Sequence, residues 1–448
     1  MGDQCTLRLV RELRQIERSE QLAFTVRYDE SNIRDIQALI IGPPGTPYEL
    51  GFYEFSIQIP SDYPANPPAV KIRTTNKGRT RFGPNLYANG KVCLSILGTW
   101  HGSRGEQWSP AQGLESVMLS IQSLLSSNPY TLEPGFDDDQ RANDTENMEI
   151  YKSKIRHENL RLSVIAPLEQ ALKPPSPPRR MAPRVGQEFS PEENCDFDYE
   201  LELDPALLNQ SKFDDFRKRR FLWYLEFYHN AIEKGITDEA RRQGMSFIQM
   251  PFEGYGNSMT GEWNYINLQS RFLSLRDRLM EETHRWPVEG LVLVEEDAGI
   301  AVKLRGQHEQ IAADMNAYPQ VIDLSLVDGN PFIWKLTYAG RNESKLEGGI
   351  IKIKIYISPR HPEEQPRAFV EPPLFHIRVS KLGALMYLPS HADEIGQHIE
   401  GIINTLDDDN PPYNPLMTVN PEATALCWGS EVDRRLYRRK LRESLEES

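Results

Sequence analysis

The spacing of apolar residues changes along the N-terminal part of the chain, and each spacing predicts a different element. Over 4–18 apolar residues recur every three positions with arginines between them, which predicts an amphipathic helix. Over 53–60 apolar and polar residues alternate, as in a half-buried strand, and 22–41 alternates in a similar way. After a proline-rich turn, 69–73 fits a further antiparallel strand. We therefore expect a helix followed by an antiparallel sheet.

Helical spacing returns in the next hundred residues. Ser109 offers a helix N-cap with Pro110 at the first helical position, and 114–125 then carries apolar residues at helical spacing. A second helical stretch, with alternating charges, covers about 140–172. It stops at the proline-rich run 174–180, which predicts a semi-rigid extended linker. The first domain is expected to close there.

The middle of the chain is mainly helical in its pattern. The segment 213–232 is so aromatic that it predicts a largely buried helix, and 268–279 forms a second apolar stripe. The basic cluster Arg217-Lys218-Arg219-Arg220 has two interpretations, a solvated helix face or a nuclear signal. The solvated face is the ordinary one for a basic run on a helix.

An internal repeat begins near residue 297. A helical stretch over 297–316 precedes two paired strands over 332–338 and 349–357, and a helix with apolar spacing follows over 395–406. This order is that of the N-terminal elements. The same fold is therefore predicted twice in the chain.

The repeat does not extend to the cysteine. Aligning Gly90 with Gly383 places Met386 opposite Cys93 and Arg378 opposite Asn85. A thioether cannot act as the nucleophile of acyl transfer, which needs a thiolate. The second copy is therefore expected to be inactive.

These patterns together predict an α/β chain of the α+β kind. We expect an antiparallel sheet with flanking helices, present twice, and a mainly helical region between the copies. The expected boundaries are 1–172 for the first copy, 173–190 for a proline-rich linker, 191–290 for the helical extension and 291–448 for the second copy.

Composition and net charge limit the classes of partner that the chain is expected to bind. The 448-residue chain has a formal net charge of −14, which argues against nucleic acid or an anionic membrane and favours proteins as partners. Its four cysteines are widely separated and form no CxxC pair, so we expect no disulfide framework, metal site or cofactor. Since no apolar stretch approaches the roughly 20 residues that cross a bilayer, and the N-terminus is unlike a secretion signal, we expect a cytoplasmic or nuclear location.

Cys93 is the one position where the chain suggests covalent chemistry. It lies in an apolar run, and Asn85 precedes it by a loop's length. A thiol with an amide beside it can serve as an acyl carrier with an oxyanion donor. The alternative is a buried small hydrophobe, since free cysteine is among the most buried residue types.

Four motifs surround this cysteine in order: Tyr63-Pro64-Ala65-Asn66-Pro67-Pro68, Phe82-Gly83-Pro84-Asn85, Gly90-Lys91-Val92-Cys93-Leu94-Ser95-Ile96-Leu97 and Trp108-Ser109-Pro110. In this order and spacing they resemble the ubiquitin-conjugating enzyme family over roughly 5–165. The motif around Cys93 is most similar to the large Z-type subgroup, in which an extra domain follows the catalytic one. Residues 297–445 resemble a catalytically inactive variant of the same fold.

The resemblance implies a ubiquitin-conjugating fold, in which a four-stranded antiparallel meander packs against flanking helices, with a shallow groove around Cys93. It implies that Cys93 accepts ubiquitin or a ubiquitin-like modifier as a thioester from an activating enzyme. Asn85 would donate its amide to the oxyanion formed when a lysine amine attacks. A ubiquitin ligase and protein substrates are the further partners to consider, and the implied substrate contacts are Leu94, Trp108, Ser109, Pro110 and Glu133.

Several positions depart from the family pattern. Gly83 stands where the family usually has a histidine, and Ala65 replaces an aromatic residue often used to engage ligases. The segment 98–107 is longer than the common pattern, is expected to wall the groove, and contains His101, the nearest candidate base. Glu133 either orients the lysine or lies in a solvated acidic loop with Asp137, Asp138 and Asp139. His376, aligned with Gly83, is expected to be a structural hydrogen-bonding residue.

Two other classes of function stay open. One is a non-catalytic ubiquitin-binding scaffold built from two ubiquitin-conjugating-like domains, with Cys93 vestigial. The other is a cysteine hydrolase, which needs a histidine positioned on the thiol. No histidine lies within the local motif around Cys93.

Overall fold

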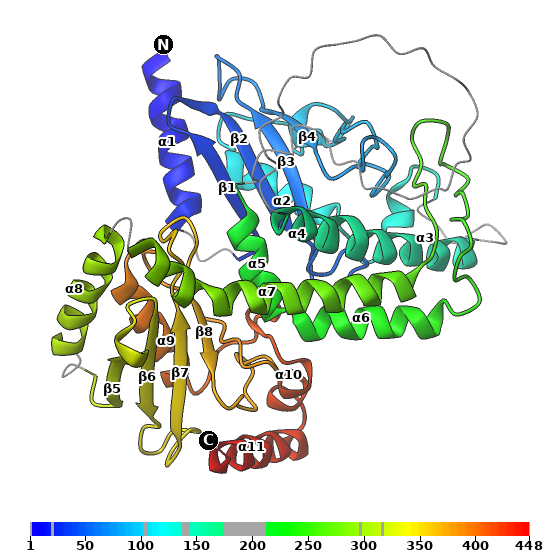
Figure 1. Cartoon of the computed structure of the whole chain (residues 1–448). Helices are drawn as coiled ribbons and strands as arrows, with labels where there is room; N and C mark the ends of the chain where they lie inside the picture. Colours follow the sequence, from blue (N-terminus) through cyan, green and yellow to red (C-terminus); the bar gives the residue numbers. More distant parts are fainter. Residues whose placement is uncertain are drawn as a thin grey trace, which may run out of the picture.

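The computed structural model describes the chain in seven stretches: residues 2–18, 22–102, 105–136, 144–173, 212–294, 298–314 and 318–447. They contain two four-stranded antiparallel sheets, each in simple sequential order, with helices between and around them (Figure 1). Beyond Lys173, the predicted linker over 173–190 and the start of the extension lie outside the described residues. In the described stretches no helix is both long enough and apolar enough to cross a membrane.

The first sheet follows the predicted helix. The predicted strand over 22–41 is a hairpin of two strands, because the polar residues Glu30 and Ser31 turn the chain between them. Strand β3 pairs with β2 and β4, and its alternate residues Phe55 and Ile57 are buried. The elements are α1 (Gly2–Arg18), β1 (Phe24–Asp29), β2 (Asn32–Ile41), β3 (Phe52–Gln58) and β4 (Ala69–Ile72).

The helix after the cysteine begins later than predicted. Its N-cap is Gly113, not Ser109, and α2 spans Leu114–Ser123. Ser109 and Gln112 exchange hydrogen bonds, with the Ser109 N–H donating to the Gln112 side chain and the Gln112 N–H to the Ser109 carbonyl. This closed turn absorbs Ser109 and Pro110, so the Ser-Pro signal marks a turn ahead of the helix.

Two groups of helices build the middle of the molecule. The predicted helical stretch over 140–172 is present, with a π-helical segment, Asn159–Ile165, inside it. The predicted single helix over 213–232 is broken at Tyr224, whose backbone leaves the helical region. The elements are α3 (Asp144–Glu158), α4 (Ala166–Ala171), α5 (Asp214–Trp223), α6 (Leu225–Asp238) and α7 (Tyr265–Val294).

The basic cluster on α5 fits neither interpretation made from the sequence. Arg217, Lys218 and Arg220 are buried, so the run is not a solvated face and is not presented as a signal. Arg217 pairs with Glu54 of β3, and Lys218 pairs with Glu282 of α7 at 2.6 Å. Buried cations need such partners, and these partners come from segments far away in the sequence.

The second sheet has the predicted order of elements. The strands predicted over 332–338 and 349–357 are present and pair antiparallel. The helices predicted over 297–316 and 395–406 are also present. The elements are α8 (Gly299–Asp314), β5 (Val321–Leu326), β6 (Ile333–Ala339), β7 (Ile350–Tyr356), β8 (Arg367–Val370), α9 (Ile395–Asp407), α10 (Pro421–Cys427) and α11 (Glu431–Glu446).

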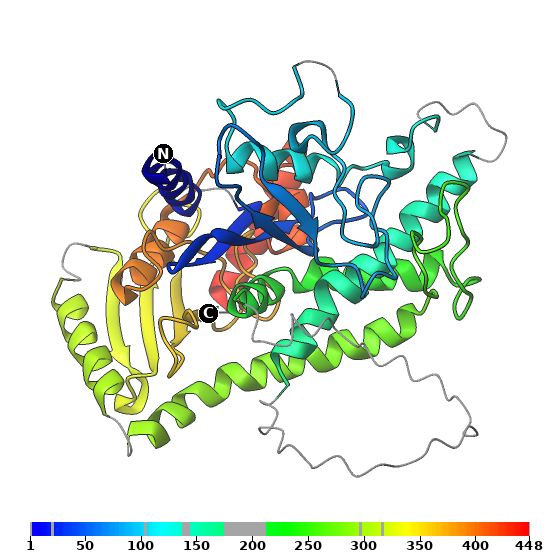
Figure 2. The same cartoon turned by 90° about the horizontal axis from the view of Figure 1, so that it is seen from above.

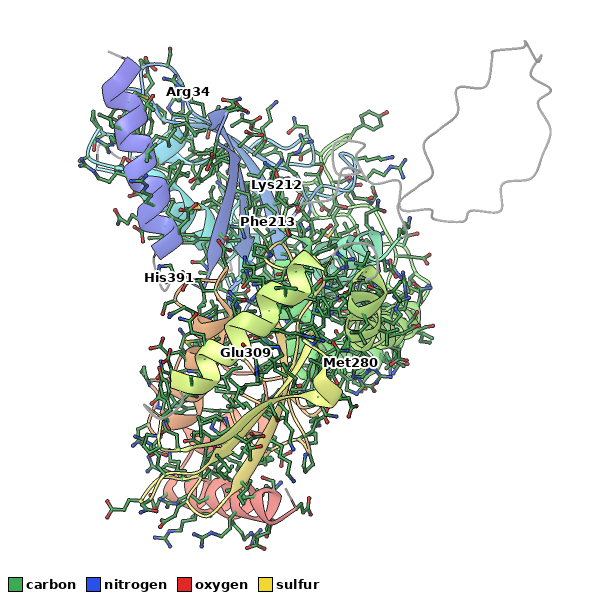
Figure 3. The ribbon with its side chains drawn as sticks, turned by 60° about the vertical axis from the view of Figure 1, so that its left-hand side comes forward. Arg34, Lys212, Phe213, Met280, Glu309 and His391 are labelled. Atoms are coloured by element: carbon green, nitrogen blue, oxygen red, sulfur yellow. The ribbon has the colours of Figure 1, made fainter. Side chains whose placement is uncertain are left out.

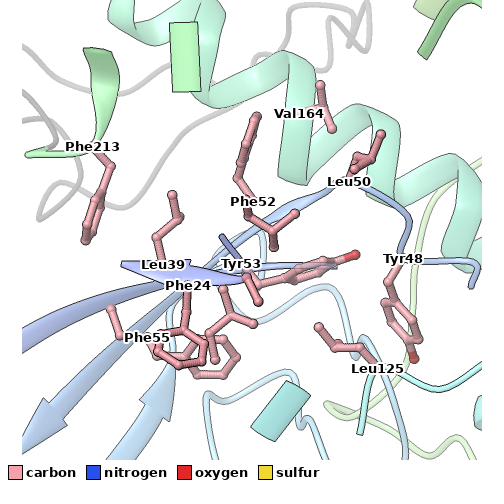
Figure 4. Packing of buried hydrophobic residues seen from close by; sticks show 14 of the residues in the cluster. Phe24, Leu39, Tyr48, Leu50, Phe52, Tyr53, Phe55, Leu125, Val164 and Phe213 are labelled. Carbon is pink, nitrogen blue, oxygen red and sulfur yellow. The ribbon is translucent and has the colours of Figure 1, made fainter. Parts of the chain in front are cut away.

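Helices α5 and α7 join the two sheets. Helix α7 runs under the first sheet and on to the second one (Figures 1 and 2). One continuous buried apolar cluster includes Phe55 of the first sheet, Phe221 of α5 and Phe369 of the second sheet. Figures 3 and 4 show Phe213, just before α5, beside the first sheet. The N-terminal sheet and the helical extension therefore share a core.

Candidate active site

The loop that carries Cys93 is a tight hairpin-like structure between β4 and α2. The Gly90 N–H donates to the Tyr87 carbonyl, and Gly90 has a φ of 93°, a conformation that favours glycine. Leu86 and Val92 then form an isolated bridge, and the Cys93 N–H donates to the Asn85 carbonyl at 2.9 Å. The backbone therefore brings Asn85 and Cys93 together, as their spacing suggested.

The Asn85 side chain is held against the backbone of the cysteine. Its Nδ2 donates to the Cys93 carbonyl oxygen at 3.0 Å. Its Oδ1 is buried without a hydrogen-bond partner, which is unusual for a buried polar atom. In this arrangement the amide lies beside the thiol residue, and within the described stretches Nδ2 donates only to the Cys93 carbonyl.

Cys93 is buried in this conformation, and the shallow groove expected around it does not expose the residue. Cys93 is only 2% exposed. Thr99 ties the following segment back across both neighbours of the cysteine. Its hydroxyl donates to the Val92 carbonyl at 2.7 Å and accepts from the Leu94 N–H at 2.9 Å. The first part of the long 98–107 segment is thus anchored to the backbone on both sides of Cys93.

Tyr87 is a site residue that the sequence analysis missed. Burial raises the pKa of the Tyr87 phenol, and the neighbouring Cys93 side chain raises it further. The ring also lies under the guanidinium of Arg81, whose Cζ is 5.1 Å from the ring centroid. The only sequence signal for a role of Tyr87 in the site is that this polar residue lies in the turn, two positions after Asn85.

Glu133 forms an ion pair instead of lying in a solvated loop. Its Oε2 is 2.9 Å from Nη2 of Arg81, and its side chain is 24% exposed. Arg81 also donates to the carbonyls of Gly83 at 3.2 Å and Pro84 at 2.8 Å. The acidic residues 137–139 that were grouped with Glu133 lie outside the described stretches. Glu133 therefore acts here through Arg81 on the segment before Asn85.

The helical extension completes this segment from the other side. The Arg81 N–H donates to the Ser258 carbonyl at 3.0 Å, and Nη1 of Arg81 donates to the Phe252 carbonyl at 3.1 Å. The Ala88 N–H donates to the Asn257 side chain at 3.2 Å. The loop that leads to Cys93 is therefore built partly on residues about 170 positions further along the chain.

A buried ion pair fixes that part of the extension. Lys154 of α3 and Glu253 are both fully buried, with Nζ and Oε2 2.6 Å apart. Glu253 also accepts from the N–H groups of Met250 at 2.8 Å and Met259 at 3.0 Å. The Glu253 carboxylate therefore has both a counter-charge and hydrogen-bond donors, which a buried carboxylate requires.

The departures from the family pattern have local explanations. A Cβ on Gly83 would lie 3.3 Å from the Tyr48 hydroxyl oxygen, which donates to the Phe82 carbonyl at 2.6 Å. Tyr48 thus takes the space beside Gly83.

The predicted substrate contacts differ in exposure. Trp108 donates from Nε1 to the Pro64 carbonyl at 2.9 Å, whereas Ser109 and Pro110 are exposed and Leu94 is half-buried. His101 is exposed, and Ala65 is exposed in the turn.

The corresponding loop of the second sheet repeats the backbone without the chemistry. Val379 and Leu385 form an isolated bridge, and the Met386 N–H donates to the Arg378 carbonyl at 2.8 Å. His376 accepts the Arg378 N–H on Nδ1, as expected of a structural residue, and burial lowers its pKa to about 3. No group of residues suited to bind a metal occurs in the described part of the chain.

Helix α5 covers this second loop. Trp223 donates from its ring nitrogen to the Leu385 carbonyl at 3.0 Å, and Met386 is 1% exposed in the shared apolar cluster. Tyr224 donates to the Leu416 carbonyl at 2.6 Å. Met386, the residue that aligns with Cys93, is therefore covered by the helical extension of the same chain.

Comparison with known proteins gives a consistent result. Residues 8–159 match the family described as "Ubiquitin-conjugating enzyme". The chain is 36% identical over 284 residues to "Ubiquitin-conjugating enzyme E2 Z" of Xenopus tropicalis, covering 63% of this chain and 74% of that one. It is 46% identical over 281 residues to the protein of the same name from Danio rerio, covering 63% and 70%. Against the Homo sapiens protein of that name, identity is 36% and coverage is 63% and 65%.

Proposed function

The chain belongs to the ubiquitin-conjugating enzyme family and is of the Z type, and on this premise we propose that it carries ubiquitin or a ubiquitin-like modifier on Cys93. The single observation that carries the proposal is the paired contact of Asn85 and Cys93, in which the backbone bond and the side-chain bond are 2.9 and 3.0 Å long. The activating enzyme, a ligase and protein substrates are the partners that this role requires.

The first step exchanges one thioester for another. The Cys93 thiolate attacks the carbonyl carbon of the activating enzyme's thioester, a new C–S bond forms, and the donor thiolate leaves. Because bond types are the same before and after, the step needs positioning more than strong activation. No histidine base on Cys93 is required for it.

The second step moves the acyl group to an amine. A neutral lysine amine attacks the thioester carbon, and the negative charge collects on the former carbonyl oxygen. The C–S bond then breaks, and the proton lost by the nitrogen goes to the departing sulfur, which leaves Cys93 as a thiol and the product as an amide. Asn85 is the donor available for that oxygen. To reach it, Nδ2 exchanges its bond with the Cys93 carbonyl for one with the oxyanion, and oxyanion donors are worth about 3 kcal/mol in other acyl transfers.

Both steps require Cys93 to become exposed. We take the hydrogen bonds of the exposed Thr99 as the local contacts that must open, since they hold the backbone on both sides of Cys93. Each such bond contributes about 1 kcal/mol net, so opening this segment costs a few kcal/mol and is within reach of partner binding. We therefore propose a closed resting state that opens when the modifier is delivered.

A charging assay tests the proposal. Full-length protein is incubated with activating enzyme, ATP and ubiquitin, or with a ubiquitin-like modifier, and a thiol-sensitive adduct is expected. Cys93→Ala should abolish it, and Cys427→Ala is the matched control, because Cys427 is also a free cysteine. An adduct that survives Cys93→Ala, or the absence of any adduct across modifier and enzyme pairs, contradicts the proposal.

We further propose that 291–448 is a catalytically inactive second copy of the fold. Support comes from the same sequential sheet order and from the repeated bond between the positions of Asn85 and Cys93 in both loops. Since α5 covers Met386, we assign this copy a supporting role for the extension and not a modifier-binding groove at that loop.

A non-catalytic scaffold is the second candidate, and the 2% exposure of Cys93 is the observation that favours it. A scaffold would bind ubiquitin with the same affinity before and after its thiols are blocked, and would form no thioester. Equal binding together with a Cys93-dependent thioester would reject it.

A further inference from the structure

Every nitrogen of the Arg81 guanidinium group donates a hydrogen bond. Nε donates to the Gly83 carbonyl at 3.2 Å, and Nη2 donates to the Pro84 carbonyl at 2.8 Å. Nη1 donates to the Phe252 carbonyl of the helical extension at 3.1 Å, and Nη2 also donates to Glu133 at 2.9 Å. Arg81 is only 2% exposed. Because the guanidinium is planar and its donors have fixed directions, these bonds hold the segment in one position.

The contacts of Arg81 lie on both sides of Asn85 in the sequence. The two residues directly before Asn85 supply carbonyls that Arg81 binds, and the Tyr87 ring after it has its centroid 5.1 Å from Cζ of Arg81. The Asn85 side chain has little support of its own. Its Nδ2 donates to the Cys93 carbonyl, and its Oδ1 is buried without a hydrogen-bond partner among the described residues. The orientation of this amide therefore depends on where the backbone of the turn is held.

The corresponding loop of the second sheet supports its turn in another way. In the alignment of the two loops, His376 corresponds to Gly83 and Leu374 corresponds to Arg81. His376 accepts the Arg378 N–H on Nδ1 at 3.2 Å, so the histidine supports the turn from within. Leu374 is buried and has no side-chain donor. Where the histidine is present, the position of Arg81 is apolar, and where the histidine is absent, this position holds a cation that binds the turn.

A side chain at Gly83 would have to share its space with Tyr48, which lies on the loop between β2 and β3 (Figure 4). A Cβ on Gly83 would make a tight contact of 3.3 Å with the Tyr48 hydroxyl oxygen. That hydroxyl donates to the Phe82 carbonyl at 2.6 Å, so a histidine at this position would disturb a bond that already holds the turn. Support from within the turn is therefore replaced by the bonds of Arg81.

We propose that Arg81 is a positioning residue for acyl transfer from Cys93. It keeps the turn in the place where the Asn85 amide meets the oxyanion, as a histidine supports the turn of the corresponding loop. This inference rests on the proposed function of Cys93 and deepens it. The carbonyls of Phe252 and Ser258 accept hydrogen bonds from Arg81, so the helical extension takes part in setting the rate of transfer.

A double-mutant cycle with Asn85→Ala tests whether Arg81 acts through Asn85. The full chain is charged with modifier, the activating enzyme is stopped with EDTA, and loss of the thioester to free lysine is followed in a single turnover. Arg81→Lys retains a positive charge beside Glu133 but lacks the planar fork that binds several acceptors at once. Arg79→Lys is the matched control, because Arg79 is exposed and lies in the same segment. Circular dichroism checks that each variant is folded.

Arg81→Lys should slow transfer to lysine at least about tenfold while charging of Cys93 is retained, since loss of a whole oxyanion donor costs about 100- to 1,000-fold. In the Asn85→Ala background the same change should slow transfer by less than about twofold, because no amide is left to position. Arg79→Lys should transfer at the wild-type rate. An unchanged rate in Arg81→Lys, equal slowing in both backgrounds, or loss of charging together with transfer overturns the proposal.

Glu133→Gln is a milder variant for the same cycle. Glutamine keeps an oxygen that can accept from Nη2 of Arg81 but removes the negative charge. If Glu133 acts through Arg81, its effect on transfer should also disappear in the Asn85→Ala background. A Glu133→Gln effect of equal size in both backgrounds would contradict this route and would indicate a contact with the attacking lysine.

Hydrogen exchange tests the hold of Arg81 on the turn without any modifier. The Cys93 N–H, which donates to the Asn85 carbonyl, should exchange at least about fivefold faster in Arg81→Lys than in the wild-type chain, and Arg79→Lys should match the wild type. If no modifier is ever attached to Cys93, the proposed function fails, while faster exchange still supports the hold of Arg81. Unchanged exchange in Arg81→Lys refutes that hold even when charging succeeds, so the two proposals fail separately.

Discussion

Replacing Glu253 by glutamine should loosen the segment that leads to Cys93. Glu253 is fully buried, pairs with Lys154, and accepts the N–H groups of Met250 and Met259. In Glu253→Gln the Lys154 ammonium loses the paired carboxylate charge and keeps only neutral acceptors, among them the Ile248 carbonyl at 2.9 Å. Breaking one side of a buried ion pair costs about 3–5 kcal/mol. We expect a loss of this size, because the amide also turns a donor towards a backbone N–H.

Replacing Lys154, the other member of the ion pair, should lower the free energy of unfolding by less. Lys154→Met leaves the Glu253 carboxylate with two backbone N–H donors, whereas Glu253→Gln leaves a buried cation with neutral acceptors and no paired carboxylate. In Lys154→Met/Glu253→Gln no charge is buried, so the double variant should recover about half or more of the loss in Glu253→Gln.

Native-state hydrogen exchange is the suitable assay. The chain has a second buried apolar cluster within the C-terminal sheet besides the shared one, so it need not unfold in one step. The reporters are the amides of Arg81 and Ala88, which donate to Ser258 and Asn257 of the extension. Their opening free energy should fall by about 3 kcal/mol or more in Glu253→Gln. A fall below about 1 kcal/mol, or a double variant as unstable as Glu253→Gln, would refute the reasoning.

Three further predictions concern the active site and its supporting helix. Thr99→Val removes the bonds to Val92 and Leu94, so peptide mapping should show faster alkylation of Cys93, and an unchanged rate would contradict the proposed cover. Asn85→Ala should slow transfer to lysine about 100- to 1,000-fold while charging of Cys93 is retained, and equal loss of both steps would argue for a structural role. Burial alone would raise the pKa of Glu158, but Arg161 and a neighbouring histidine outweigh it and lower the pKa to about 2. Because this lies below the unfolded value, Glu158 contributes about 3 kcal/mol above roughly pH 4.5 and loses it as pH falls towards 2. Acid unfolding curves of Glu158→Gln should therefore lack this loss, and identical curves would contradict the assignment.

The sequence predicts what depends on local pattern. Alternation indicated β3, helical spacing indicated α7 and α9, and the glycine at 90 together with the one at 383 aligned two loops that share a backbone bond. These features depend on neighbours within a few residues. The pairing of Asn85 with Cys93 belongs to the same class, since a tight turn joins them.

What the sequence did not predict depends on contacts between distant segments. Arg217 is buried because Glu54 lies across the core from it, and nothing around Arg217 indicates that partner. Glu133 pairs with Arg81, and Thr99, in a segment of unusual length, bonds the backbone on both sides of Cys93. The break at Tyr224 has a similar origin, because the tyrosine hydroxyl binds the Leu416 carbonyl of the C-terminal part.

The aromatic contacts between α3 and the extension limit how the chain can be divided. Phe252 packs against Tyr130, Phe136 and Tyr151, with ring centroids 5.2 to 5.3 Å apart. A fragment ending at residue 172 would leave these rings in water and would strip Arg81 of two of its bonds. A chimera that contains the cysteine-bearing half should therefore include the polypeptide through the end of α7. A boundary at residue 172 would separate side chains that pack against one another in this molecule.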